Sequence, residues 1–104
     1  MKAEKVVQSE IMKYIKSMGW YCIKVIKGNE NGIHDLIACI DGKFVSIEVK
    51  AERYHNNPAN QMSEWQKRHM KLVRNANGIS MCVATLEQFI DVLDFCWLDD
   101  EFLS

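Results

Sequence analysis

The stretch GIHDLIACIDGKFVSIEVKAE, residues 32–52, decides the fold of this chain. Two runs rich in apolar and β-branched residues, 35–40 and 43–50, flank the dipeptide Asp41-Gly42. An Asp-Gly pair between two such runs is typical of a type I′ turn, because both of its residues tolerate positive φ. The stretch therefore predicts two antiparallel strands joined by a two-residue turn.

The same turn fixes which side chains face each other across the two strands. With Ile40 opposite Lys43, Asp35 lies opposite Glu48, and the alternation of side chains puts Lys50 on the face of Glu48. Two like charges directly opposite destabilise a hairpin, and a bound divalent cation is the simplest physical reason to keep them. Carboxylate oxygens are hard ligands that suit Mg²⁺ or Mn²⁺. Spacing alone leaves open a solvated strand face with an ion pair, in which Asp35 only ends the preceding loop.

On the N-terminal side of the hairpin, the sequence predicts an amphipathic helix and then a strand. Apolar residues recur at helical spacing from residue 3 onwards, and Gly19 follows where a helix would end. These apolar residues are Val7, Ile11, Tyr14, Ile15 and Met18. Residues 20–26, WYCIKVI, are aromatic and β-branched, which favours a strand leading into the turn-forming GNENG.

On the C-terminal side, residues 51–62 contain the only proline and three asparagines and fit neither period, so we expect a mobile loop. Ser63, with Gln66 in capping-box position, opens a second helix that Asn77-Gly78 closes. Residues 79–84 are a short buried strand. A third helix follows, with capping-box spacing at Thr85 and Gln88 and an apolar face of Leu86, Phe89, Ile90 and Leu93.

The predicted order is therefore α-β-β-β-α-β-α in a single domain, residues 1–104. This is an α/β fold with a mixed four-stranded sheet flanked by helices. Because a helix connects the hairpin to the fourth strand, that strand can lie parallel to one of its predecessors.

Composition excludes several classes of protein. The 104 residues are 48% hydrophobic and 26% charged with one proline, which excludes a disordered, collagen-like or low-complexity chain. No apolar run approaches the roughly 20 residues of a membrane span, and the start MKAEKVVQSE lacks the apolar stretch of a signal peptide. We expect a cytoplasmic protein without a membrane partner, whose four cysteines are mostly buried thiols rather than disulfides or zinc ligands.

The charges are distributed unevenly along the chain. Residues 85–104 carry six acids and no lysine or arginine, which leaves residues 1–84 with thirteen bases against eight acids. A basic body can attract phosphate even though the formal net charge is −1, because the local field decides binding.

The motifs together resemble the core of the PD-(D/E)xK nuclease superfamily, and the whole chain is similar to a stand-alone, phage-type VRR-NUC domain. The matching features, in order over residues 7–93, are a helix acid at Glu10, a G-x-P-D-like motif at Gly32 to Asp35, E-V-K at Glu48 to Lys50, S-x-x-Q at Ser63 to Gln66, and Asn77-Gly78. The chain departs from the family at His34, which stands where the family has proline. We expect His34 to be a loop residue, with contact to metal-bound water or phosphate as the alternative.

The resemblance implies roles for these residues. Asp35, Glu48 and the carbonyl of Val49 would bind Mg²⁺ or Mn²⁺, with Glu10 completing the site from the first helix unless it is only a solvated helix acid. Lys50 would orient the attacking water and stabilise charge in the transition state. Gln66 has two competing interpretations, a catalytic-site residue or a helix cap.

A DNA-binding surface is predicted beside this site. Bases gather on the second helix, and the preceding loop offers further polar and aromatic groups; the candidates are Lys67, Arg68, Lys71, Arg53, Tyr54 and His55. Such a surface could hold a phosphate backbone without reading bases. A solvated helix face is the alternative.

The function expected from the resemblance is a metal-dependent, structure-specific DNA endonuclease of the Holliday junction resolvase kind, in a bacterial or infected host cell. A non-catalytic interaction module on a nuclease fold, or a flap or single-strand nuclease, are the alternatives. The acidic and apolar tail, residues 95–104, carries large apolar groups that a domain this small has little core to bury: Phe95, Trp97, Leu98, Phe102 and Leu103. We therefore expect a two-fold homodimer, which would give a four-way junction two symmetric active sites.

Overall fold

The structure, a computed structural model, describes the backbone of residues 1–103 and the side chains of residues 1–96. The helices and strands are α1 (Glu4–Ser17), β1 (Tyr21–Lys24), β2 (Leu36–Ile40), β3 (Lys43–Val49), α2 (Glu64–Asn75), β4 (Ile79–Val83) and α3 (Leu86–Leu103). This order confirms the predicted α-β-β-β-α-β-α arrangement. None of the helices in the described part of the chain is both long and apolar enough to cross a membrane.

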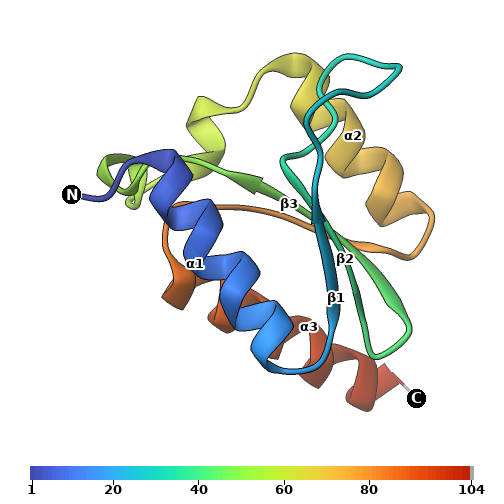
Figure 1. The fold of residues 1–104 in the computed structure, drawn as a ribbon. Helices are drawn as coiled ribbons and strands as arrows, with labels where there is room; N and C mark the ends of the chain where they lie inside the picture. The colour runs from blue at the N-terminus through green and yellow to red at the C-terminus, as the bar shows by residue number, and fades with distance from the viewer. Residues whose placement is uncertain (104) are drawn as a thin grey trace.

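The four strands form one mixed sheet in the order β1-β2-β3-β4. β1 and β3 run antiparallel to β2, and β4 runs parallel to β3. Helices α1 and α3 cover one face of the sheet, where the rings of Tyr14 and Phe89 meet edge to face with centroids 6.2 Å apart. Helix α2 covers the other face (Figure 1). The central strand β3 is therefore enclosed between two layers of helix.

The turn between β2 and β3 is the predicted one. Asp41 has a φ of 50° and Gly42 a φ of 83°, as a type I′ turn requires. The pairing of Ile40 with Lys43 continues to Leu36 opposite Ile47, so the predicted register is confirmed. Asp35 stands one residue before β2, at the point where the ladder ends.

Both faces of β3 are buried, and they differ in chemistry. Val45, Ile47 and Val49 are fully buried in the apolar core under α1 and α3. Ser46 and Glu48 alternate with them and are only 4% and 2% exposed on the face of α2. The alternative of a solvated strand face is thus wrong, because α2 covers it.

The connection from β3 to α2 differs from the expected mobile loop. It contains two short 3-10 helices, η1 (Glu52–Tyr54) and η2 (Pro58–Gln61). Hydrogen bonds from the amide of His55 to the Glu52 carbonyl and from the amide of Met62 to the Ala59 carbonyl close these single turns. Periodicity cannot reveal a helix of one turn, which is why the sequence missed them.

Several apolar side chains lie further out than their spacing predicts. Met18, part of the predicted apolar stripe, caps the end of α1 and is half exposed, and Trp65 and Leu72 are 53% and 46% exposed on α2. Of the cysteines, Cys22 is buried and free, Cys82 is half-buried and free, and Cys39 is exposed, so mostly buried thiols were too strong an expectation. The backbone of α3 continues through the predicted tail, whose side chains at Trp97, Leu98, Phe102 and Leu103 lie outside the described residues.

Gly32 is a position where the fold admits no side chain. Its φ is +80°, and a Cβ there would overlap the backbone carbonyl carbon of Trp65 at the start of α2. Gly19 has the same φ of +81°, but a Cβ there would meet nothing within 4 Å. Gly19→Ala therefore tests backbone strain alone, whereas Gly32→Ala adds a steric conflict with α2.

We expect Gly19→Ala to lower the free energy of unfolding by about 1–2 kcal/mol, the cost of a left-handed alanine. Gly32→Ala should cost about 2 kcal/mol more, because overpacking adds to the strain. Urea denaturation of both variants measures the difference. Equal losses would contradict the close packing of the residue 32–35 segment against α2.

Candidate active site

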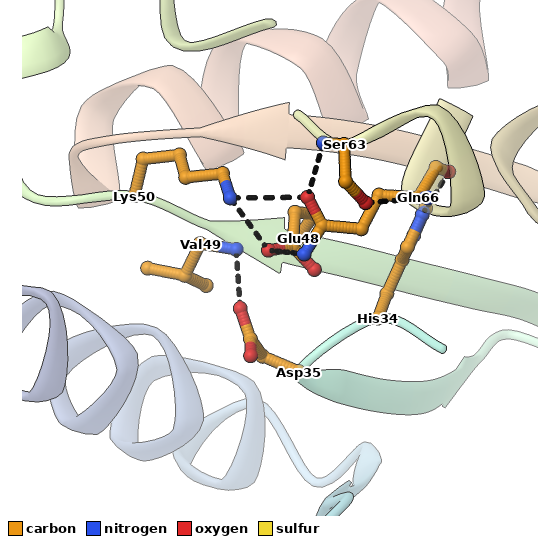
Figure 2. A network of polar contacts seen from close by, with 7 residues as sticks. All are labelled: His34, Asp35, Glu48, Val49, Lys50, Ser63 and Gln66. Carbon is orange, nitrogen blue, oxygen red and sulfur yellow. Dashed lines mark hydrogen bonds and ion pairs between the residues drawn. The ribbon is translucent and has the colours of Figure 1, made fainter. Parts of the chain in front are cut away.

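Glu48 is the centre of a polar network beneath α2 (Figure 2). Its Oε2 accepts a hydrogen bond of 2.9 Å from Nε2 of Gln66 and lies 3.1 Å from Nζ of Lys50. Its Oε1 is buried and has no hydrogen-bond partner. One carboxylate oxygen is thus held by the protein, and the other is left for something the chain does not supply.

Asp35 reaches the same end of β3 from the start of β2 (Figure 2). Its Oδ2 accepts a hydrogen bond of 2.9 Å from the backbone amide of Val49, the residue after Glu48. This bond satisfies an amide at the end of the strand and fixes the orientation of the carboxylate. The two acids that the sequence placed opposite each other therefore belong to one site.

Gln66 performs both of the functions that the sequence left as alternatives. Its backbone amide donates to Oγ of Ser63, and its Oε1 accepts from the amide of Ser63 at 2.9 Å, which completes the capping box. The same Oε1 accepts from Nζ of Lys50 at 3.1 Å, and Nε2 donates to Glu48. The capping box thus fixes the side-chain amide of Gln66, and this amide orients Lys50 and Glu48.

Burial, the largest cause, and the charge of Asp35 together raise the pKa of Glu48 to about 7 against the opposing effect of Lys50. Burial is the larger cause, since a charged carboxylate loses its hydration beneath α2. The chain alone therefore does not fully stabilise the charge on Glu48 at neutral pH. A cation bound at Oε1 would stabilise the charged form.

The donor atoms fit a hard divalent cation. They are carboxylate oxygens, one of them buried without a partner, which is the chemistry that Mg²⁺ and Mn²⁺ prefer. The structure brings together Asp35 and Glu48, but within the described residues no three His, Cys, Asp or Glu side chains converge. Mg²⁺ commonly takes only one or two carboxylates, with water and substrate phosphate completing its shell.

The structure pairs Glu10 with a lysine rather than with these two acids. Its Oε2 forms an ion pair of 2.8 Å with Nζ of Lys2. The acid of α1 whose charge raises the pKa of Glu48 is instead Glu4, in the first turn of the helix. Sequence reasoning did not single out Glu4. The one available signal is Gln8, a polar residue among the buried residues of α1, which lies one helical turn after Glu4 and on the same side of the helix.

His34 has a larger role than the loop residue we expected. It is 2% exposed, with Nδ1 3.0 Å from Oγ of Ser46 on β3 and Nε2 2.9 Å from the carbonyl of Gln66 on α2. Oγ of Ser46 lies 2.7 Å from Oγ of Ser80 on β4. Burial lowers the pKa of His34, which keeps it neutral. His34 thus ties the segment before Asp35 to the helix that carries Gln66.

The predicted DNA-binding residues are distributed over η1 and α2, and most have partners within the chain. Arg53 lies over the ring of Tyr54, 4.8 Å from its centroid, and Nδ1 of His55 lies 3.0 Å from the Glu52 carbonyl. On α2, Lys67 pairs with Glu64 at 3.3 Å, Arg68 pairs with Glu30 at 3.2 Å, and Lys71 is exposed. Their part in DNA binding stays a prediction.

An acid before one strand of a hairpin, and an acid and a lysine two residues apart on the next, define a PD-(D/E)xK-like arrangement. No family model matches the chain, and no curated protein does. Among solved structures, the chain is similar to one described as a VRR_NUC domain, with a TM-score of 0.73 and 19% identity over 90% of this chain and 97% of that one. This chain has the fold of a VRR_NUC domain.

The burial of Glu48 predicts a specific dependence of stability on pH. Its pKa of about 7 in the folded protein lies above the usual 4.5, so the folded state holds a proton that the unfolded state releases between these values. The contribution of Glu48 to stability is therefore full below pH 4.5 and is lost as pH rises through 7. Glu48→Gln removes this dependence and keeps the shape.

We expect the unfolding free energy of the parent, minus that of Glu48→Gln, to fall by about 2–3 kcal/mol between pH 5 and pH 8. Taking the difference cancels the effect of His34, whose lowered pKa acts in the opposite direction. Adding Mg²⁺ at pH 8 should raise the stability of the parent more than that of the variant. A difference that stays flat from pH 5 to pH 8 would contradict the buried, unpaired carboxylate.

Proposed function

We propose that this chain is a divalent-metal-dependent nuclease that hydrolyses phosphodiester bonds in DNA. The observation that carries the proposal is the buried, unpartnered Oε1 of Glu48 beside Asp35, with Nζ of Lys50 3.1 Å from the other oxygen. The likeness to a VRR_NUC domain supports the same chemistry through its fold.

Asp35, Glu48 and the carbonyl of Val49 would hold the cation. When bound, Mg²⁺ or Mn²⁺ supplies charge that lowers the pKa of a coordinated water and polarises the scissile phosphate. The hydrogen bond from the amide of Val49 engages one oxygen of Asp35 and leaves the other available as a ligand. Each acid would thus offer one oxygen to the cation while the protein holds the other.

Lys50 is placed to act on the reacting groups. Its side chain is 13% exposed, and two of the three hydrogens of its ammonium group are directed to Glu48 and Gln66. The third is available to the attacking water or to a phosphate oxygen, where a positive charge stabilises the transition state. Gln66 is a positioning residue, because it aligns Lys50 and Glu48 through contacts with both.

We further propose that the substrate is a branched DNA such as a four-way junction and that the chain acts as a homodimer. An exposed apolar row supports the assembly: Tyr21, Cys39 and Phe44 are neighbours across β1, β2 and β3, and Leu72 of α2 borders Phe44. Tyr21 and Phe44 are 60% and 47% exposed. A two-fold dimer would bury such a row and supply two active sites.

Incubation of labelled linear duplex, flap and four-way junction DNA with Mg²⁺, Mn²⁺ or EDTA tests the activity. We expect cleavage with either metal and none in EDTA, and Asp35→Asn should abolish it because a ligand oxygen is lost. Asp41→Asn is the matched control, since Asp41 lies at the other end of the hairpin in a left-handed conformation that asparagine accepts.

Cleavage by Asp35→Asn at the parental rate would contradict the assignment of the site. Light scattering of the same preparation tests the assembly. A dimer mass with paired incisions in the junction supports the finer proposal, whereas a monomer that cuts linear duplex equally well would overturn it.

A further inference from the structure

A second polar surface lies outside the candidate active site, in the groove between α1 and β1. The groove has a volume of about 300 Å³. Its lining includes three lysines of α1, one lysine of β1 and a buried amide: Lys5, Lys13, Lys16, Lys24 and Gln8. No part of the mechanism above uses these residues.

The lysines of this groove are not neutralised by the described part of the chain, where none of the four has an ion pair. Residues 1–28 contain six lysines but only two acids, and of these Glu10 pairs with Lys2. The other acid, Glu4, forms no ion pair with a groove lysine in the described part of the chain. The groove therefore keeps a concentrated positive charge, which attracts an anion.

On helix α2, by contrast, most of the basic side chains already have partners within the chain. Lys67 and Arg68 have carboxylate partners in Glu64 and Glu30. Arg74 donates from Nε and Nη2 to the carbonyl of Ser80 at 3.2 and 2.9 Å. An incoming phosphate would have to displace the partners of Lys67, Arg68 and Arg74 on α2, where Lys71 is exposed without a described ion pair. In the groove it would meet four unpaired ammonium groups.

Gln8 is the second observation that points to a ligand. Its side chain is 5% exposed, and its Oε1 is buried without a hydrogen-bond partner. A buried polar group left unpaired costs about 1–3 kcal/mol, so a partner in the groove would stabilise it. Rotation of the amide exchanges its oxygen and nitrogen, so Gln8 can offer a phosphate oxygen an N–H donor.

The two walls of the groove are connected to residues of the candidate active site. On β1, Lys24 pairs with Leu36, and the amide of the next residue, Val25, donates to the carbonyl of Asp35 at 2.8 Å. On α1, Lys5 follows Glu4, the acid that acts on Glu48. A DNA backbone lying in the groove would thus be held beside the segment that bonds to Asp35.

We propose that this groove, rather than the basic face of α2, binds the phosphate backbone of the DNA next to the cleaved bond. The identity of the ligand rests on the proposed nuclease function. Lysines contact phosphates without reading bases, so this surface positions DNA and gives no sequence preference. The binding should weaken with salt in proportion to the number of lysines engaged.

The test compares two triple variants that remove the same charge. One is Lys13→Gln/Lys16→Gln/Lys24→Gln in the groove, and the other is Lys67→Gln/Arg68→Gln/Lys71→Gln on α2. Binding of a fluorescent duplex is measured by anisotropy in EDTA, over a series of salt concentrations, so that cleavage does not interfere. Melting temperatures confirm that both variants fold.

We expect the groove variant to raise Kd by about tenfold or more and to flatten the slope of log K against log salt by about 2–3. The α2 variant should raise Kd by less than about threefold. Replacing the same three groove lysines by arginine should restore binding, since the charge remains. An equal or larger loss from the α2 variant, or no rescue by arginine, would overturn the proposal.

This experiment also separates the groove from the proposed function. If the parent cleaves DNA with Mg²⁺ but the groove variant binds normally, the groove proposal fails and the nuclease stands. If the groove variant binds weakly but the parent cleaves none of the DNA substrates, the groove stands and the nuclease fails.

Discussion

A carboxylate buried near the end of an inner strand is the constraint on which the rest of this structure depends. Glu48 lies on β3 beneath α2, where its charge has lost its water. An isolated buried charge is expensive, and it persists only with partners. Lys50 and Gln66 satisfy one of its oxygens, and the other is left unpaired. That incomplete compensation is a reason to infer a cation, and it distinguishes a site from an ordinary structural ion pair.

Much of the local architecture serves to keep Gln66 where it meets Glu48. The capping box of Ser63 fixes the start of α2, and His34 binds the carbonyl of Gln66 while its other nitrogen contacts Ser46. Gly32 permits the segment before Asp35 to pack against the backbone of α2. The same few contacts therefore set the positions of both acids, since Asp35 follows His34 directly. The contacts that stabilise the fold are therefore also those that position the candidate site residues.

The hairpin and its register could be predicted because an Asp-Gly turn and a two-residue alternation are local signals. That register puts Asp35, Glu48 and Lys50 near one another, but their interpretation as a site, like that of Gln66, came from the family resemblance rather than from spacing. The roles of His34 and Glu4 could not be predicted in this way, because they depend on how α2 and α1 pack on the sheet. The ion pairs that occupy Lys67 and Arg68 also depend on distance in space, and Glu30 lies far from Arg68 in the sequence.

The most direct test of the buried carboxylate as a cation ligand is its own titration. Carbon NMR of side-chain-labelled glutamate, assigned through Glu48→Gln, would follow the Glu48 carboxyl with and without saturating Mg²⁺. A pKa near 7 in the free protein that falls well below this value with Mg²⁺ is the expected result, because the cation stabilises the charged form. A pKa near the ordinary 4.5 that Mg²⁺ does not change would contradict the account.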